Sequence, residues 1–433
     1  MLLSRALARL RRSSDTASPL PDMAGLPLVG HAAQFREDPF VLLGQAAAKG
    51  PLVRVRLLDK LVWVVTDPAL VHELLDDQDT WRRGEGLAPM LGRNMLTSNG
   101  ADWTAARQLA RPSFHPKMTD RGAAAFGACA APLLDAWTAP ASIDLARQLG
   151  TVFALAAPPV FGMHLRPDEA ARLPAALDVL QTWAFRSLAG GSRRSSDVKA
   201  AQELLNGVLD RNLTRAPDAG PPTYLERIRQ DHAVPREDLA DHLRLVLFAA
   251  TDNPPNTTAI ILWLLAHHPE VLRQLVADID SVLGDRLPTP ADLDALPLLD
   301  RVIDESMRLI PPAWWLARIA AEDTVLGGHP MPAGTYAFIG IYWLHRHPEA
   351  WTDPDRFDPA RFTQPPPAGA FLPFGQGPRR CIGTRFARQS VAMAVAMVLQ
   401  RFVLTPDHPR PLPWYGRFTL RSRVGVPMRM APR

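Results

Sequence analysis

The segment 374–383 carries the residue types and spacing of a site that holds a reactive metal group. Its sequence, Phe-Gly-Gln-Gly-Pro-Arg-Arg-Cys-Ile-Gly, places one cysteine after two glycines and two arginines. A thiolate ligand must be kept deprotonated, and nearby cations and backbone N–H donors favour that state. Glycine lets the backbone turn tightly and approach whatever the sulfur holds. We therefore expect Cys381 to be the single thiolate ligand of a buried metal cofactor.

This segment resembles the haem-binding loop of the cytochrome P450 family, in which five residues recur at fixed spacing. All five are present, as Phe374, Gly377, Arg379, Cys381 and Gly383. The resemblance implies that Cys381 is the axial thiolate of a haem (iron protoporphyrin IX), that Phe374 packs beside the sulfur, and that Arg379 pairs with a haem propionate. It also implies the family's fold, which is mainly α with a small β region.

Composition limits the other possibilities. The chain has 433 residues, a formal net charge of +4 and two cysteines, of which Cys129 lies among apolar and small neighbours and is interpreted as an inert thiol. Two distant cysteines exclude a disulfide framework and fit a reducing, cytoplasmic compartment. The arginines are scattered along the chain, so we expect no nucleic-acid partner. No apolar segment is long enough to span a membrane, and we expect no transmembrane segment.

The elements that position the site follow from the hydrophobic pattern. The resemblance spans most of the chain and implies that residues 19–433 form one haem-thiolate monooxygenase domain, a monomer, and we expect residues 1–18 to be a flexible basic segment. Alternation of apolar residues predicts a hairpin over 52–57 and 61–65. Asp67-Pro68 then predicts the start of a helix, with proline at its first position, and the pattern from about 102 to 310 is predominantly helical. An irregular, proline-rich stretch over about 348–373 precedes the cysteine loop, and a buried helix follows it.

Two charged residues lie three apart within an apolar context. Glu305 and Arg308 share one helix face, which neighbouring leucines and isoleucines indicate is buried. A buried ion pair needs further partners to offset its desolvation. By the resemblance, Arg361 joins Glu305 and Arg308 in a structural triad, although Ala360 replaces the glutamate that usually precedes this arginine in the family.

Further arginines are candidates for the second propionate. Trp103 and Arg107 lie one helical turn apart, and in the family such a pair meets a haem propionate. Arg318 matches another propionate-binding arginine. Two carboxylates held by two or three arginines is a sensible charge balance. Ordinary core packing of Trp103 beside a solvated Arg107 is the alternative.

The segment 248–258 is the most individual feature of the chain. It occupies the oxygen-binding turn of the family's long central helix, where Asp252 keeps the usual acid but Asn253 replaces the usual threonine. Pro254 and Pro255 follow, and each proline removes a helical hydrogen bond, at a cost of about 3 kcal/mol in a helix interior. We hypothesise that Asn253 orients water or substrate, whereas Asp252 or a substrate group delivers protons. The alternative is that Asn253 only caps or kinks the helix.

The resemblance implies a haem-dependent monooxygenase that activates O2 with two electrons and two protons. We expect no fused reductase, so a ferredoxin or flavodoxin must supply the electrons, and arginines around the sulfur could dock such an acidic partner. These are Arg379, Arg380, Arg385 and Arg388. Three alternatives stay open: an oxidative coupling or cyclisation enzyme (C–C or C–N bond formation), a peroxide-driven peroxygenase, and a non-catalytic haem-thiolate sensor.

Six residues are candidates for the substrate pocket, because they lie in segments that line the distal pocket in this family. They favour a medium-sized hydrophobic or aromatic small molecule of secondary metabolism. They are Leu87, Met90, Phe248, Ala249, Trp314 and Trp315.

Overall fold

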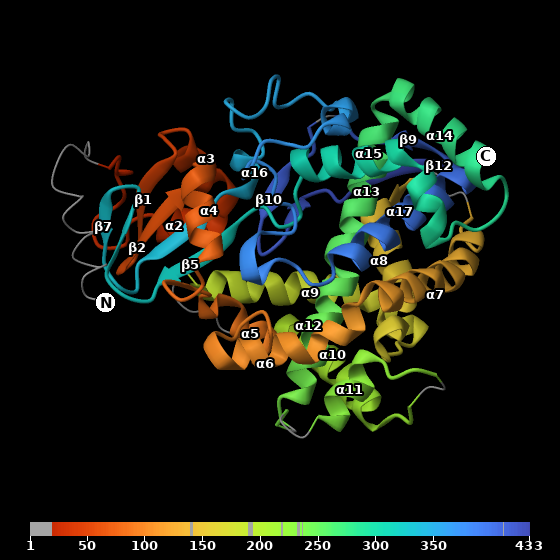
Figure 1. Ribbon diagram of the computed structural model, residues 1–433, viewed down its shortest axis with the longest axis horizontal. Helices are drawn as coiled ribbons and strands as arrows, with labels where there is room; N and C mark the ends of the chain where they lie inside the picture. Colours follow the sequence, from red (N-terminus) through yellow and green to blue (C-terminus); the bar gives the residue numbers. More distant parts are fainter. Residues whose placement is uncertain are drawn as a thin grey trace.

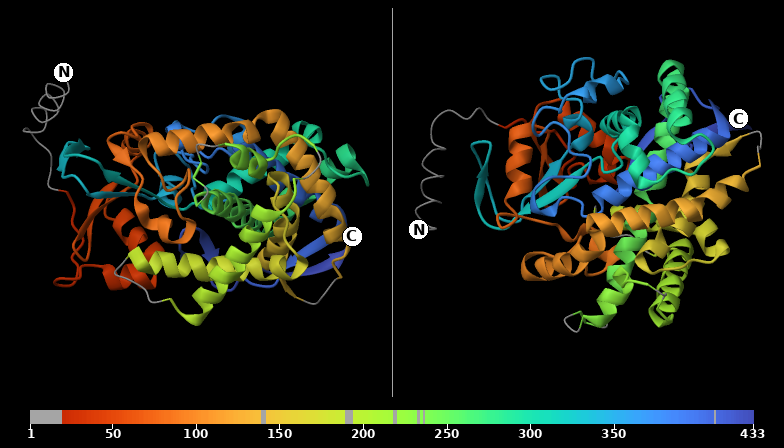
Figure 2. Two further views of the ribbon diagram at one scale, coloured as in Figure 1. Left: turned by 90° about the horizontal axis from the view of Figure 1, so that it is seen from below. Right: turned by 45° about the vertical axis from the view of Figure 1, so that its right-hand side comes forward.

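A computed structural model describes residues 20–138, 142–188, 194–217, 220–231, 234–235, 237–409 and 411–433. A large helical part lies beside a smaller β region, as Figures 1 and 2 show. The mainly α fold predicted from the sequence is therefore confirmed. The expected flexible segment 1–18 lies outside the described residues.

The main sheet has five strands in the order β1-β2-β8-β5-β3. β1 and β2 form the predicted antiparallel hairpin, in which Leu52 pairs with Val65. β8 adds to β2 in parallel, and β5 joins β8 and β3 in antiparallel fashion. The strands are β1 (Leu52–Leu57), β2 (Lys60–Val65), β3 (Trp81–Arg82), β5 (Leu316–Ala320) and β8 (Tyr336–Ile339).

Smaller sheets complete the β content. One has the order β4-β12-β9, and two are hairpins, β6-β7 and β10-β11. Their strands are β4 (Ile143–Asp144), β6 (Thr324–Leu326), β7 (His329–Met331), β9 (Phe402–Pro406), β10 (Trp414–Gly416), β11 (Leu420–Ser422) and β12 (Pro427–Pro432).

Among the helices of the first half, α2 and α3 pack against the main sheet, whereas α7 and α8 pack against α17 and α13 of the second half. Asp67 caps α4 by accepting a hydrogen bond from the Leu70 N–H at 2.9 Å, as the Asp-Pro sequence predicts. The helices are α2 (Ala32–Glu37), α3 (Pro39–Ala47), α4 (Pro68–Asp76), α5 (Ala88–Leu91), α6 (Gly100–Ala110), α7 (Pro116–Asp135), α8 (Leu145–Ala156), α9 (Pro167–Leu188), α10 (Ser196–Thr214) and α11 (Tyr224–Gln230).

The helices of the second half contain the central core. α13 is buried from Pro254 to Leu265, and its part from Ala259 onward is apolar on every side, as expected of a helix enclosed by others. It packs against α8, α15 and α17. These helices are α12 (Leu239–Thr251), α13 (Asn253–Ala266), α14 (Pro269–Leu283), α15 (Pro297–Leu309), α16 (Ile341–Leu344) and α17 (Thr384–Arg401). None of the described helices is long and apolar enough to cross a bilayer.

The proline pair does not lie inside one continuous helix. α12 ends at Thr251 and α13 begins at Asn253, with Asp252 between them at φ −105° and ψ −62°. Pro254 and Pro255 thus stand in the first turn of a new helix, where a backbone N–H has no helical partner to lose. The chain therefore avoids most of the cost expected for prolines in a helix interior by breaking the helix directly before them.

Candidate active site

The cysteine loop is a tight turn held against α4. The Cys381 N–H donates to the Phe374 carbonyl at 2.9 Å. Gly375 and Gly377 both have φ +70°, a backbone conformation that favours glycine. A Cβ atom on Gly377 would lie 2.3 Å from the Leu75 carbonyl oxygen, so only glycine lets the loop approach α4 this closely.

Cys381 lies among protein atoms, yet its side chain is accessible because it lines a cavity of about 320 Å³ and a second hollow beside it. Burial raises the pKa of its thiol, whereas a hydrogen bond from the Gly383 backbone and the charge of Arg107 act in the opposite direction. Binding to a metal deprotonates a coordinating thiol outright. The thiol therefore has a metal ligand's position and polar surroundings that partly oppose the effect of burial.

The wall of this cavity is mostly apolar. Leu96, Val246, Phe248, Ala249 and Leu316 contribute to it, together with the loop around Cys381. Its cationic lining residues are arginines, and its described lining includes no aspartate or glutamate. The cavity therefore combines an apolar wall with uncompensated positive charge.

Three of these arginines form a cluster without a counter-ion. Burial lowers the pKa of Arg83 to about 10, and burial with the charges of Arg83 and Arg107 lowers that of Arg379 to about 10. Burial and the charges of Arg83 and Arg379 lower the pKa of Arg318 well below its usual value. Within the described residues, none of the three forms an ion pair with a carboxylate, and Nε of Arg83 and of Arg379 has no hydrogen-bond partner. Uncompensated buried charge is costly, so the cluster fits an anionic ligand with more than one carboxylate.

The sequence predicted Arg318 and Arg379 as propionate ligands but missed Arg83. Arg82 and Arg83 are adjacent, and nothing in their local sequence distinguishes them. The pairing of β3 with β5, in which Arg82 lies opposite Ile319, brings Arg83 near Arg318. Tertiary structure alone therefore selects Arg83.

The predicted Trp103 and Arg107 both line the cavity from α6. The guanidinium of Arg379 lies 4.9 Å from the centre of the Trp103 ring, and its Nη2 donates to Ser98 O and Asn99 Oδ1, both at 2.9 Å. Arg107 Nη2 donates to the Arg380 carbonyl at 2.8 Å, so it also ties α6 to the cysteine loop.

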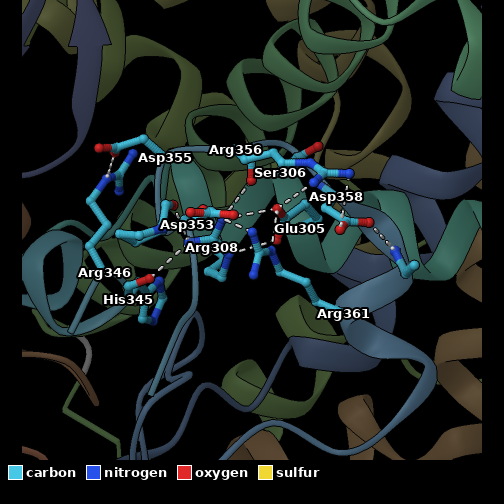
Figure 3. A network of polar contacts seen from close by, with 12 residues as sticks. Glu305, Ser306, Arg308, His345, Arg346, Asp353, Asp355, Arg356, Asp358 and Arg361 are labelled. Atoms are coloured by element: carbon cyan, nitrogen blue, oxygen red, sulfur yellow. Dashed lines mark hydrogen bonds and ion pairs between the residues drawn. The ribbon is translucent and has the colours of Figure 1, made fainter. Parts of the chain in front are cut away.

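Glu305, Arg308 and Arg361 come together as the sequence predicted, and Figure 3 shows both arginines directed at the glutamate. Arg308 donates to both Glu305 oxygens, at 2.6 and 2.9 Å, and Arg361 Nε lies 3.5 Å from Glu305 Oε1. Glu305 and Arg308 are fully buried. The Asp358 N–H also donates to Glu305 at 2.8 Å.

Glu305, Arg308 and Arg361 together form what we call the paired arginine centre. Its remaining N–H donors bind backbone carbonyls of the irregular stretch. Arg308 reaches the carbonyls of His345, Pro354 and Arg356, at 3.1, 2.7 and 3.2 Å. His345 Nε2 accepts a hydrogen bond from the Leu372 N–H at 2.8 Å. One ion pair on α15 thus fixes both ends of the segment that leads to the cysteine loop.

Asp252 is placed differently from the expectation of a proton-delivering acid facing the cofactor. It does not line the cavity. Its Oδ1 accepts from Gln181 Nε2 at 2.9 Å and pairs with Arg421, while Oδ2 has no partner among the described residues. Burial raises the pKa of Asp252, against the opposing effect of Arg421. The helix break turns this carboxyl away from the cavity toward α9 and β11.

Asn253 does line the cavity, beside Ala249, Ala250 and Pro254. Its side-chain Oδ1 is buried without a hydrogen-bond partner. Thr257 also lines the cavity, and its hydroxyl donates to the Asn253 backbone carbonyl at 2.9 Å.

Two of the six predicted pocket residues, Phe248 and Ala249, line the cavity. Leu87 and Met90 do not, and Met90 is 5% exposed within the core. Trp314 and Trp315, also predicted to line the pocket, do not line the cavity either. They precede β5 instead, and both indole N–H groups donate to the Arg417 carbonyl at 3.0 Å.

Their neighbours take the place of the tryptophans in the wall. These are Pro312, Ala313 and Leu316.

The four arginines that were expected to form a docking surface make different contacts in the structure. Arg379 belongs to the cavity, Arg385 pairs with Asp120, and Arg388 pairs with two aspartates of α15. Arg380 is the member that is exposed with no ion pair among the described residues. Most of the positive charge that was expected to bind an acidic redox partner is therefore paired with aspartates or directed to the cavity.

Comparison with known proteins agrees with the geometry. A model of the family "Cytochrome P450" matches residues 19–153 and 215–422. Cyclooctatin synthase of Streptomyces melanosporofaciens is 30% identical over 442 aligned positions, covering 94% of each chain. Cyclooctat-9-en-7-ol 5-monooxygenase of the same organism is 28% identical, covering 88% of each chain. Pentalenene oxygenase of Streptomyces avermitilis is 27% identical, covering 88% of this chain and 90% of its own.

The chain belongs to the cytochrome P450 family. It is an oxidoreductase, a haem-dependent monooxygenase that uses O2 and electrons from a redox partner. The residues of the cavity fit this cofactor, because Cys381 offers the sulfur ligand and the arginine cluster lacks the anion that two propionates would supply.

Proposed function

We propose that the protein oxidises an uncharged, medium-sized hydrophobic molecule of secondary metabolism in the cavity beside Cys381. The observation that carries this proposal is the wall of the cavity, which is apolar around Val246, Phe248, Ala249 and Leu316 and lacks carboxylates among its described lining. A substrate amine would find no counter-ion there, and an apolar skeleton is stabilised by its removal from water.

The names of two relatives support the same class of substrate. One relative is a monooxygenase of cyclooctat-9-en-7-ol and another is a pentalenene oxygenase. Both names denote unsaturated carbon skeletons without a charged group. Similarity at 27–28% identity supports a substrate of this kind, not either compound itself.

In this proposal, residues of the cavity hold the haem. Cys381 binds the iron, and Phe374 shields the sulfur. Haem supplies activation of O2 with two electrons and two protons. Its propionates are held by Arg83, Arg318 and Arg379, beside Trp103 and Arg107.

Proton delivery is assigned to the groups that line the cavity. Asn253 holds a water or a substrate group there, and the Thr257 hydroxyl can exchange its bond to the Asn253 carbonyl for one to water. Asp252 acts indirectly, by fixing the helix break through Gln181 and Arg421.

A ferredoxin or flavodoxin is proposed as the electron donor. A second hollow, of about 1040 Å³, is lined by Cys381, Arg380 and residues of α6, α15 and α17, so it brings an external partner close to the sulfur. One domain over residues 19–433, a monomeric state and a cytoplasmic location complete the proposal.

Spectroscopy of the haem-loaded protein tests this proposal. We expect the reduced, carbon-monoxide-treated protein to show the red-shifted band of a thiolate ligand, and Cys381→His to lose that band while retaining haem. Titration with terpenoids, polyketides, aromatic peptides and fatty acids should then shift the iron spin state only for uncharged hydrophobic members. A fully loaded, folded protein without the band would refute the proposal.

A further inference from the structure

One hydrogen-bond acceptor in the cavity wall lacks a partner. Among the described lining residues, the buried side-chain atoms without a partner are Nε of Arg83, Nε of Arg379 and Oδ1 of Asn253. The two arginine atoms are donors and belong to the cluster that fits the propionates. Oδ1 of Asn253 is an acceptor, and the propionates cannot satisfy it.

The position of Asn253 explains why the protein does not satisfy this amide. It is the first residue of α13, directly after the helix break, and its backbone carbonyl is already occupied by the Thr257 hydroxyl. Its neighbours in the wall are Ala249, Ala250 and Pro254, whose side chains carry no hydrogen-bonding group. An unsatisfied buried carbonyl is unfavourable. Asn253 is partly exposed and lines the cavity, so a ligand in the cavity lies beside its amide.

We propose that the Asn253 amide binds a hydroxyl group of the substrate, so that the substrate is a hydrophobic alcohol. This inference rests on the function proposed above and narrows its substrate class. A hydroxyl both donates and accepts one hydrogen bond at an amide. A mostly apolar wall around the unpaired Asn253 amide therefore favours a carbon skeleton with a hydroxyl in a defined place, since a misplaced hydroxyl would be buried without a partner.

The proposal also indicates where this reaction stands in a series of enzymatic reactions. A hydrocarbon skeleton acquires a hydroxyl either by an earlier oxygenation or by capture of water when the skeleton is formed. An enzyme that anchors this hydroxyl acts after such a step, and it oxidises a second carbon, whose position is fixed by its distance from the anchor.

Calorimetric titration of the haem-loaded protein with matched probes tests the inference without measuring turnover. The probes are 1-adamantanol with adamantane and cedrol with cedrane. Each pair shares a skeleton, and only one member has a hydroxyl. For wild type we expect the alcohols to bind at least as tightly as the hydrocarbons, although burial of an unpaired hydroxyl would favour the hydrocarbons.

Asn253→Leu keeps the size of the side chain and removes its hydrogen bonds. We expect it to shift the alcohol-to-hydrocarbon affinity ratio by about tenfold in favour of the hydrocarbon, which corresponds to one ordinary hydrogen bond. Asn253→Ser, which retains a donor and an acceptor, should recover part of the ratio. Val246→Ala, which enlarges the same wall without changing polarity, should alter both affinities and leave the ratio unchanged.

The outcomes separate this inference from the proposed function. Equal ratios in wild type and Asn253→Leu, or a wild-type preference for both hydrocarbons, overturn the alcohol anchor while hydrophobic binding still stands. Tighter binding of 1-adamantanecarboxylate than of 1-adamantanol also overturns it, because the arginines would then be the anchor. Failure of all four neutral probes to bind a protein that shows the thiolate band counts against the proposed function itself.

Discussion

Two groups of buried arginines in this protein differ in one respect, the presence of a carboxylate. In the paired arginine centre, Arg308 and Arg361 meet Glu305, and the remaining donors bind backbone carbonyls. In the cluster of Arg83, Arg318 and Arg379, the described residues supply no carboxylate. Burial lowers the pKa of all three, and neighbouring positive charges lower those of Arg318 and Arg379 further. The first group is complete within the chain, whereas the second becomes complete only with an anionic ligand.

The comparison shows how one chain can use the same type of side chain for folding at one place and for ligand binding at another. Removing one partner of a satisfied buried ion pair leaves an uncompensated charge, which destabilises the fold. Removing a member of an unsatisfied cluster relieves repulsion in the protein without ligand. Mutations in the two groups should therefore have opposite effects on the haem-free protein.

Glu305→Ala should have the largest effect. It leaves Arg308 charged and fully buried, which costs about 3–5 kcal/mol in comparable sites. We expect a strongly lowered free energy of unfolding and little haem incorporation, measured by denaturant unfolding and by the ratio of haem to protein absorbance. Glu305→Gln, which keeps an acceptor for the Asp358 N–H, should lose less. Full haem loading and unaltered unfolding of the alanine variant would show that the centre is not structural.

Arg318→Met should separate stability from haem retention. The unfolding free energy of the haem-free protein should stay unchanged or increase, because a repelled, desolvated charge is removed. Haem should leave the variant faster, since a charged hydrogen bond contributes about 1.5–3 kcal/mol. Haem transfer to apomyoglobin measures the rate. The matched variant Arg308→Met should destabilise the haem-free protein, and a similar loss in both variants would contradict the comparison.

His345 gives the paired centre a pH dependence. Burial is the main cause that lowers its pKa from 6.5 to about 3. As pH falls below 6.5 the unfolded chain therefore binds a proton before the folded protein does. Its contribution to stability is complete above pH 6.5 and decreases below it by about 1.4 kcal/mol per pH unit, or about 2 kcal/mol at pH 5.

Denaturant unfolding at several pH values between 7 and 5 measures this slope. His345→Gln can still accept the hydrogen bond from the Leu372 N–H but does not titrate, so the difference between wild type and variant isolates the histidine. Parallel curves for the two proteins would indicate that His345 is already protonated or exposed in the folded state.

Arg385→Ala should have the smallest effect and serves as the surface reference. Its ion pair with Asp120 is half exposed, and such pairs contribute about 0–1 kcal/mol. We expect less than about 0.5 kcal/mol change in unfolding free energy and unaltered haem content. A loss as large as that of Glu305→Ala would mean that exposure is a poor guide to the role of arginines here.

Local sequence signals were sufficient for part of this molecule. The alternation over 52–57 and 61–65 predicted the hairpin, and Asp67 with Pro68 predicted the start of α4. The loop around Cys381 and the pairing of Glu305 with Arg308 could also be predicted. In each case the interacting residues are neighbours in the chain or stand at a fixed helical spacing.

What the sequence by itself determined is the family, the cysteine loop and the ion pair within one helix, because short-range geometry and fixed motifs specify them. Only the tertiary structure decided that Arg83 lies near Arg318 and that Asp252 pairs with Arg421. It also decided that Trp314 and Trp315 bond to the Arg417 carbonyl and do not line the cavity. These outcomes depend on strand pairing and on a helix break that redirects side chains. Contacts between residues far apart in the chain are set by packing of the whole fold, which no local pattern records.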